Sequence, residues 1–156
     1  MRPRSEPSVS GERRGTTPQV GIVSNDLPRK VAAVELKLEL VPIPVRDIDR
    51  AKAFYADQLG FNVDHDVEPT SAVRVVQLTP PGSACSICLT RGLPALDGEP
   101  GTIRGLHLVV DDITEARQHL VDNGVDVDEA IELGGMHYAG FIDPDGNTWT
   151  LQQINR

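Results

Sequence analysis

Cysteine and aromatic residues are scarce in this 156-residue chain. It has only two cysteines, in the segment Cys85-Ser86-Ile87-Cys88, and aromatic residues make up 4% of the sequence. The residues around this segment predict a β-strand, in which positions i and i+3 lie on opposite faces. The two thiols are therefore not placed to pair or to share a metal, and we interpret them as small packing residues.

Long apolar runs, nucleotide-binding motifs and an excess of positive charge are also missing. No run approaches the roughly 20 apolar residues of a membrane-spanning helix. No G-x-S-x-G, P-loop or G-x-G-x-x-G motif supports serine hydrolysis, nucleotide binding of that kind or Rossmann dehydrogenation. The net charge of −8 argues against nucleic acid or an anionic membrane as the main partner. Arginines near the N-terminus precede no hydrophobic segment of a secretory signal, so we expect a soluble cytoplasmic protein.

The first residues differ in composition from the rest. Residues 1–33 contain four prolines and four serines and show little apolar periodicity. We predict a flexible tail there, followed by one domain at residues 34–156. The chain is 39% hydrophobic, which suffices for one domain with a sizeable core.

The domain contains an internal repeat. The segments Asp47-Ile48-Asp49-Arg50-Ala51 and Asp112-Ile113-Thr114-Glu115-Ala116 each follow an apolar strand and begin a helix, for which aspartate is a preferred N-cap. Each helical pattern ends near a glycine, Gly60 or Gly124. The aspartates are 65 residues apart and the glycines 64, and this regular offset indicates a duplicated unit.

Three strands are predicted after each helix. They are residues 61–63, 72–79 and 84–89 in the first half, and residues 125–127, 136–142 and 148–153 in the second. The fold class is therefore α+β, with two pseudo-symmetric βαβββ modules at residues 38–91 and 104–155 and a linker at residues 92–103. We expect the two modules to form a curved mixed sheet that encloses a cavity.

Two stretches carry a resemblance to a known family. "VPIPVRDIDRAKAFYADQLGF" and "DPDGNTWTL" resemble the vicinal oxygen chelate superfamily, which includes glyoxalase I, extradiol dioxygenases, methylmalonyl-CoA epimerase, fosfomycin-resistance enzymes and bleomycin-binding proteins. The resemblance covers residues 38–155 and implies the glyoxalase-like fold.

The resemblance also implies where a metal would bind. Metal enzymes of this superfamily place ligands seven residues before each helix-capping aspartate and four residues after the glycine of each final hairpin. Those positions hold Leu40, Gly105, Ser86 and Thr150. Leucine and glycine offer no ligand atom, and neutral hydroxyls are poor ligands for divalent metals. We predict no metal and no cofactor; the alternative is an atypical divalent-metal site built on His107, with Glu39, Glu132, His137 and Tyr138 as further candidates.

Strand alternation predicts which side chains line the cavity. The candidate ligand-binding residues are Leu40, Pro42, Ser86, Gly105, His107, Thr150 and Gln152. His107 is also the candidate catalytic residue, since an imidazole titrates near neutral pH. A structural, hydrogen-bonded histidine is an equally open interpretation. Trp149 and Leu151 have the opposite parity and should pack under the helices.

Other polar residues are less clearly placed. Arg74 and Gln77 have opposite parity on one predicted strand, so at most one faces the cavity, where Arg74 could bind an anionic group. His65 lies within the acidic segment 64–68, which we interpret as a solvated loop. His119 is predicted on the surface of the second helix.

These observations favour a metal-free glyoxalase-like protein that binds a small, largely apolar or aromatic molecule, as antibiotic-sequestering resistance proteins do. The alternative is a lyase, isomerase or dioxygenase-type enzyme of the same superfamily that uses His107 or an atypical metal site. A third possibility is a module for protein association. Family analogy further predicts a homodimer.

Overall fold

The computed structural model describes residues 33–155. The chain divides between Leu36 and Lys37 into two units, and the helices and strands below all belong to the second unit. The predicted tail at residues 1–33 lies outside the described residues except for its last position. Its extent, and the predicted start of the domain at residue 34, stay predictions.

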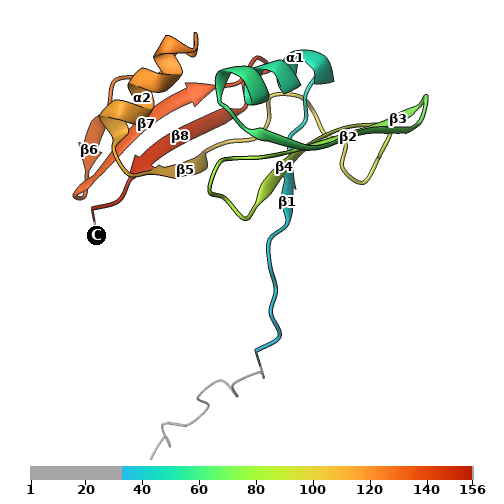
Figure 1. The fold of residues 1–156 in the computed structure, drawn as a ribbon, viewed down its shortest axis with the longest axis horizontal. Coiled ribbons are helices and arrows are strands. Elements are labelled where there is room, and N and C mark those ends of the chain that lie inside the picture. Colours follow the sequence, from blue (N-terminus) through green and yellow to red (C-terminus); the bar gives the residue numbers. More distant parts are fainter. Residues whose placement is uncertain (1–32, 156) are drawn as a thin grey trace, which may run out of the picture. The chain divides into compact units, whose positions relative to one another are not determined.

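Each half of the second unit follows the order strand, helix, three strands (Figure 1). The first module consists of β1 (Leu40–Pro42), α1 (Ile48–Ala53), the π-helical turn η1 (Phe54–Gln58), β2 (Asn62–Thr70), β3 (Val73–Thr79) and β4 (Ser86–Arg91). The second consists of β5 (Leu106–Val110), α2 (Ile113–Asp122), β6 (Ile131–Leu133), β7 (Met136–Ile142) and β8 (Thr148–Gln153). The Asp47 and Asp112 carboxylates cap the two helices by accepting the backbone N–H of Arg50 and Glu115.

The strands form two four-stranded mixed sheets with equivalent topology. Their orders are β1-β4-β3-β2 and β5-β8-β7-β6. In each sheet the first strand runs parallel to the last, and the remaining pairs are antiparallel. The α+β class and the pair of βαβββ modules are therefore confirmed. The two sheets remain separate and do not close around a cavity.

The strand that follows each helix differs from its prediction. Residues 64–68 belong to the long strand β2 instead of a loop, because Arg74 and Lys52 bind the Asp66 carboxylate and offset its charge. Residues 125–127 form only an isolated bridge, Val127 to Phe141. The Arg117 side chain binds the carbonyl groups of Val127 and Asp128, which an adjacent strand would otherwise use.

Aromatic side chains from both modules meet in one core. Five of the six aromatic residues are buried: Phe54, Tyr55, Phe61, Phe141 and Trp149. Tyr55 of η1 lies 5.7 Å from Trp149 of β8, between ring centroids. Phe54 lies 6.5 Å from Phe141 of β7. The first module's helical segment thus packs against the second module's sheet, and a single core joins the modules.

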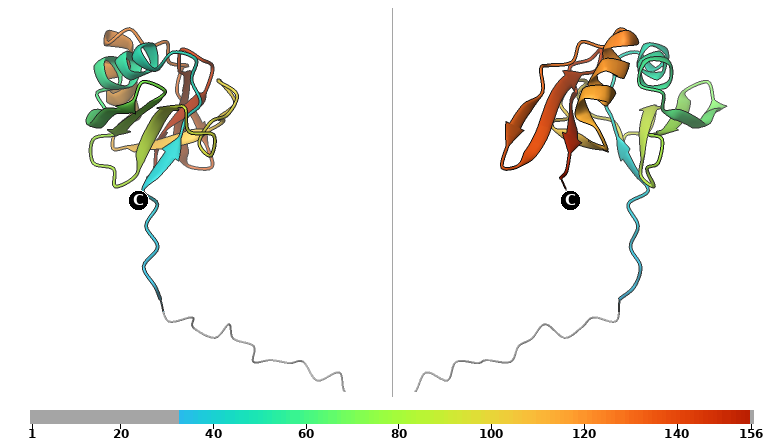
Figure 2. Two further views of the ribbon diagram at one scale, coloured as in Figure 1. Left: turned by 90° about the vertical axis from the view of Figure 1, so that its right-hand side faces the viewer. Right: turned by 60° about the vertical axis from the view of Figure 1, so that its left-hand side comes forward.

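The two helices lie on one side of the unit. In all three ribbon views, α1 and α2 are at the upper side, with the strands below them (Figures 1 and 2). Each sheet therefore has a helix-facing side and an opposite side, which we call its open face. Among residues 33–155, no helix is long and apolar enough to cross a membrane.

The Asp143 carboxylate lies at the junction of the modules. It is 2% exposed and accepts the Tyr55 hydroxyl at 2.7 Å, the Asn147 amide at 2.7 Å, and the backbone N–H groups of Asp145 and Asn147. Trp149 Nε1 donates to the Tyr55 oxygen at 3.0 Å. We call Tyr55, Asp143, Asn147 and Trp149 the clasp.

Asn147 extends the clasp to two more segments. Its Nδ2 donates to the Pro44 carbonyl at 3.1 Å, and its Oδ1 accepts the Ile103 N–H at 3.0 Å. The turn between β7 and β8 is thereby bonded to the first module and to the linker. Because these groups are buried, each lost partner leaves an unpaired polar atom.

Burial and the neighbouring Asp143 carboxylate raise the pKa of Tyr55 far above its usual value. A group whose pKa is higher in the folded state favours folding below its unfolded pKa, which is about 10 for tyrosine. This contribution is fully present at neutral pH and decreases only as the pH rises above that value.

Replacing Tyr55 by phenylalanine should destabilise the fold by about 1–3 kcal/mol, because Asp143 and Trp149 each lose a buried hydrogen-bond partner. Urea denaturation of the variant and the parent protein measures this difference. The matched control is Tyr138→Phe, whose hydroxyl donates only a long bond of 3.7 Å to Met136 Sδ. Equal stability losses in the two variants would contradict the role given to the clasp.

Candidate functional site

The open face of the second sheet carries three of the predicted ligand-binding residues. Strand pairing places His107 beside Thr150 and Val109 beside Gln152. Met136, Tyr138 and Ile142 of β7 and Ile131 and Leu133 of β6 share this face by alternation and pairing. As predicted, Trp149 and Leu151 have the opposite parity and are buried on the helix-facing side.

Several large aliphatic side chains are exposed on this face. Ile131, Leu133, Ile142 and Val109 are 59–67% exposed. Exposed aliphatic side chains that share one sheet face are typical of binding surfaces.

His107 lies at the edge of this face, and its protonation pattern can be inferred. Its Nδ1 lies 2.6 Å from the Gly105 carbonyl oxygen, which can only accept, so Nδ1 carries a proton. In the neutral ring, Nε2 is then a hydrogen-bond acceptor. The imidazole also meets the Tyr138 ring edge to face, with centroids 6.4 Å apart.

Tyr138 and Met136 lie on the open face but were not predicted as ligand-binding residues. The Tyr138 hydroxyl donates to Met136 Sδ at 3.7 Å, and Gln152 Nε2 donates to the same sulfur at 3.3 Å. The sequence suggests Tyr138 only as a possible metal ligand. The alternation along residues 136–142 could have placed it beside Thr150 and Gln152, as a ring available to a ligand.

Gly105 does not hold the position predicted for it. It precedes β5, has a φ of 70° and donates its N–H to Thr148 Oγ1 at 2.7 Å. In the first module Leu40 lies beside Ser86, whereas in the second module His107 lies beside Thr150. The residue seven positions before the helix cap is thus not the partner of Thr150 in the second module. The register of the parallel strand pair differs between the two modules, so a count from the helix cap gives Gly105 where the pairing gives His107.

The remaining predicted residues lie on the open face of the first sheet. Leu40 is beside Ser86, Pro42 is beside Cys88, and His65 is beside Gln77. Leu40 and Pro42 are half-buried, and Ser86 is buried. Leu40, Pro42 and Ser86 therefore lie on a different sheet from His107, Thr150 and Gln152. Among the described residues, no hydrogen bond or ring contact joins the two groups.

Ser86 belongs to a chain of hydrogen bonds whose direction can be assigned. The Thr79 hydroxyl donates to the Asp64 carboxylate and lowers the pKa of Asp64. Ser86 must then donate to Thr79, at 2.7 Å, and it accepts Gln77 Nε2 at 3.0 Å. Gln77 Nε2 also donates to Glu39 at 3.2 Å. The Ser86 proton is used within the sheet, so Ser86 can offer a ligand only a lone pair.

The residues at the expected metal positions do not fit a divalent metal. By strand pairing, the four positions hold Leu40, Ser86, His107 and Thr150. This set contains one imidazole, whereas a catalytic metal usually has about three protein ligands. Within residues 33–155, no group of three or more His, Cys, Asp or Glu side chains is placed to hold a metal ion.

The two cysteines do not form a disulfide. Cys88 is buried beside Pro42, and burial raises the pKa of its thiol. A raised pKa keeps the thiol protonated and unreactive at neutral pH. Packing is therefore the role that the structure supports for Cys88.

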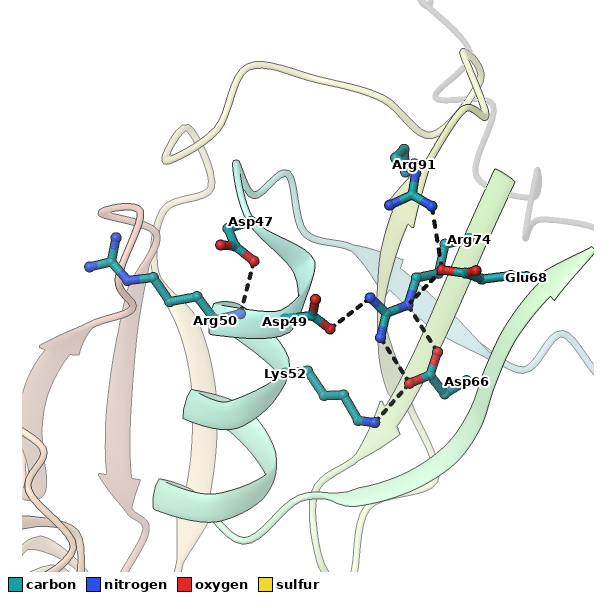
Figure 3. A network of polar contacts seen from close by, with 8 residues as sticks. All are labelled: Asp47, Asp49, Arg50, Lys52, Asp66, Glu68, Arg74 and Arg91. Carbon is teal, nitrogen blue, oxygen red and sulfur yellow. Dashed lines mark hydrogen bonds and ion pairs between the residues drawn. The ribbon is translucent and has the colours of Figure 1, made fainter. Parts of the chain in front are cut away.

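Arg74 lies among carboxylates near α1 instead of facing the open side (Figure 3). Its guanidinium binds Asp49 at 2.7 Å and Asp66 at 3.0 Å, and its side chain is 12% exposed. Hydrogen bonds from Arg74 and Lys52 lower the pKa of Asp66 to about 2. Arg74 is thus committed to joining α1 to the β2–β3 hairpin and does not present a free cation to a ligand.

Comparisons with known proteins agree with this fold. The model of the Glyoxalase/Bleomycin resistance protein/Dioxygenase superfamily matches residues 37–151. No curated protein matches the chain.

Three solved structures illustrate the similarity. TnmS3, an antibiotic binding protein from Streptomyces sp. CB03234, is 33% identical, with a TM-score of 0.69 over 79% of this chain and 99% of that one. A glyoxalase/bleomycin resistance protein from the same organism is 35% identical, with a TM-score of 0.64 over 75% and 100%. A superfamily member from Sphaerobacter thermophilus DSM 20745 is 30% identical, with a TM-score of 0.67 over 77% and 98%.

Proposed function

Because the chain belongs to the Glyoxalase/Bleomycin resistance protein/Dioxygenase superfamily, we propose that it binds a small, largely apolar or aromatic molecule without a metal. The observation that carries this proposal is the open face of the second sheet. There an imidazole, a phenol and a thioether adjoin Thr150 and Gln152, amid exposed aliphatic side chains.

The chemistry of this face suits such a ligand. The Tyr138 ring and the Met136 sulfur offer polarisable surface to a planar molecule. His107 Nε2 and the Thr150 hydroxyl offer a few directional contacts at its edge. Small-molecule sites usually combine a mostly apolar wall with a small number of polar groups.

The proposal that no metal takes part is supported by the donor set described above. Leu40, Ser86 and Thr150 provide no imidazole or carboxylate, and His107 alone cannot hold a divalent ion. TnmS3 is described as an antibiotic binding protein, which supports sequestration of a compound as the role of this chain. We expect it to act in the cytoplasm.

The second candidate is an enzyme of the same superfamily, of the lyase, isomerase or dioxygenase type. It is favoured by one observation: His107 Nδ1 is held by the Gly105 carbonyl, which leaves Nε2 free to take a proton from a bound molecule. An atypical divalent-metal site that includes His107 is the other form of this candidate.

We further propose that the ligand site is completed in a homodimer. The open face of the second sheet is exposed, whereas ligand pockets commonly bury 70% or more of a ligand's surface. A second copy could place the open face of its first sheet, with Leu40, Pro42 and Ser86, over the ligand. This arrangement would unite the two groups of predicted residues that one chain holds apart.

Replacing His107 by alanine should weaken ligand binding by about 5- to 150-fold, the cost of one hydrogen bond to a buried ligand group. Isothermal titration with a planar anthraquinone tests this. The fold should persist, because His107 is exposed. The matched control is Gln118→Ala, at an exposed position of α2 away from the open face.

The His107→Ala variant also distinguishes a ligand-binding role of His107 from a catalytic one. If His107 acts as a general base, turnover should fall by roughly 10²- to 10⁴-fold while affinity changes little. If His107→Ala leaves both affinity and turnover unchanged, the histidine is structural and the proposed site is wrong.

The dimeric site can be tested by combining two variants that each bind the ligand poorly. Leu40→Arg should block the first sheet's face, and His107→Ala should damage the second. Co-expression of the two variants should restore about a quarter of the sites, because half of the randomly formed dimers are mixed and each mixed dimer has one intact site.

A site formed within one chain would show no such recovery. Light scattering provides an independent check, since a mass near the 16.9 kDa of one chain at micromolar concentration would contradict the dimer.

A further inference from the structure

A cavity of about 440 Å³ runs along β5, between the two modules. Its wall on one side comes from α2 and β8, and on the other side from the end of η1 and the turn at residues 80–83. It shares only His107 and Val109 with the open face of the second sheet. Most of its lining therefore belongs to surfaces that the proposed ligand site does not use.

The walls of this cavity are mainly aliphatic. The apolar lining includes Leu59, Leu108, Val110, Ala116, Leu120 and Leu151. The volume falls within the range of roughly 300–1,000 Å³ that is common for small-molecule sites. None of the lining residues carries a carboxylate, an ammonium or a guanidinium group.

The cavity has two imidazoles with complementary hydrogen-bonding atoms. The Nδ1–H of His107 donates to the Gly105 carbonyl, so in the neutral ring Nε2 is a hydrogen-bond acceptor. His119 Nε2 lies 3.3 Å from the Asn123 amide nitrogen, which can only donate. The neutral His119 ring therefore accepts at Nε2 and carries its proton on Nδ1. The lining thus includes one ring that accepts and one that donates.

β5 adds backbone groups to the same cavity. It is the end strand of its sheet and pairs only with β8 among the described strands. Alternate N–H and C=O groups of an end strand point away from the sheet and lack a strand partner. The cavity lies along this strand, as shown by its four consecutive lining residues 107–110.

From these observations we propose that the cavity is a second ligand site, for a compact, neutral, apolar molecule that carries a single hydroxyl group. A hydroxyl both donates and accepts, so it matches His107 Nε2 together with His119 Nδ1 or a β5 N–H. A carboxylate has no proton to give to His107, and an ammonium has no lone pair to accept from His119. The aliphatic walls of the cavity contact the hydrocarbon part of the ligand. This inference does not depend on the proposed function of the open face.

The test compares 4-propylphenol with its methyl ether, 4-propylanisole, which can accept a hydrogen bond but cannot donate one. Each compound is titrated into the full chain, and amide shifts are followed by nitrogen–proton correlation spectroscopy. The phenol should cause saturable shifts in β5 and α2. The ether should bind about 5- to 10-fold more weakly, since His107 Nε2 loses its donor.

Two variants test the location. Ala116→Phe should fill the cavity and abolish saturable binding of the phenol, whereas Val121→Phe, on the same helix and outside the lining, should not. His119→Phe keeps a ring at an exposed position but removes its donor. It should weaken binding of the phenol and the ether alike, because both can accept a hydrogen bond, and should leave the preference for the phenol in place. This second variant keeps the test informative if Ala116→Phe does not fold.

Three results would overturn the inference. One is equal affinity for the phenol and the ether in the parent protein. Another is saturable binding that persists in folded Ala116→Phe, or shifts that centre on Tyr138 and the open face instead. The third is a change in the mass of the assembly on Ala116→Phe, which would mean that a second copy of the chain covers the cavity.

Discussion

The hydrogen bonds of the Asp143 carboxylate fix how the two modules meet. Asp143 and Asn147 lie in the turn between β7 and β8, yet they bind Tyr55 and the Pro44 carbonyl of the first module. Around them the aromatic rings of both modules form one core. Because the helix-facing sides of both sheets contribute to that core, the open faces are turned away from it. The location of the candidate ligand site follows from this arrangement.

The same packing explains why an aromatic-poor chain can still offer a ring to a ligand. Five aromatic side chains are used in the core, and Tyr138 is left on the open face of the second sheet. The two open faces differ in chemistry. The first is polar, with the chain of hydrogen bonds from Glu39 through Ser86 to Asp64, and the second is largely apolar. Their difference suits a dimer in which unlike faces meet over one ligand.

The sequence predicted those parts of the structure that depend on local pattern. The helix caps at Asp47 and Asp112 and the strands at residues 136–142 and 148–153 match the structure, because capping and alternation are set by neighbouring residues. The acidic segment in β2 was misread as a loop, since the arginine and lysine that offset Asp66 come from other elements. Polarity along one segment does not reveal such partners.

The candidate site was predicted only in part for the same reason. His107, Thr150 and Gln152 do share a face, but Gly105 was given the position that strand pairing gives to His107. Pairing register depends on where β5 begins after Gly105, and a count along the chain cannot detect the shift. The turn at residues 143–147 was recognised as a turn, whereas its bonds to Tyr55 and Pro44 cross about 90 to 100 positions of sequence.

The proposed function requires that this superfamily member binds its ligand without a metal. Elemental analysis of protein purified without a histidine tag, combined with ligand titration before and after dialysis against a chelator, tests it most directly. We expect far less than one equivalent of zinc, nickel, iron or manganese per chain and the same affinity after chelation. Close to one equivalent of metal, with binding lost on chelation and restored by the metal, would contradict it.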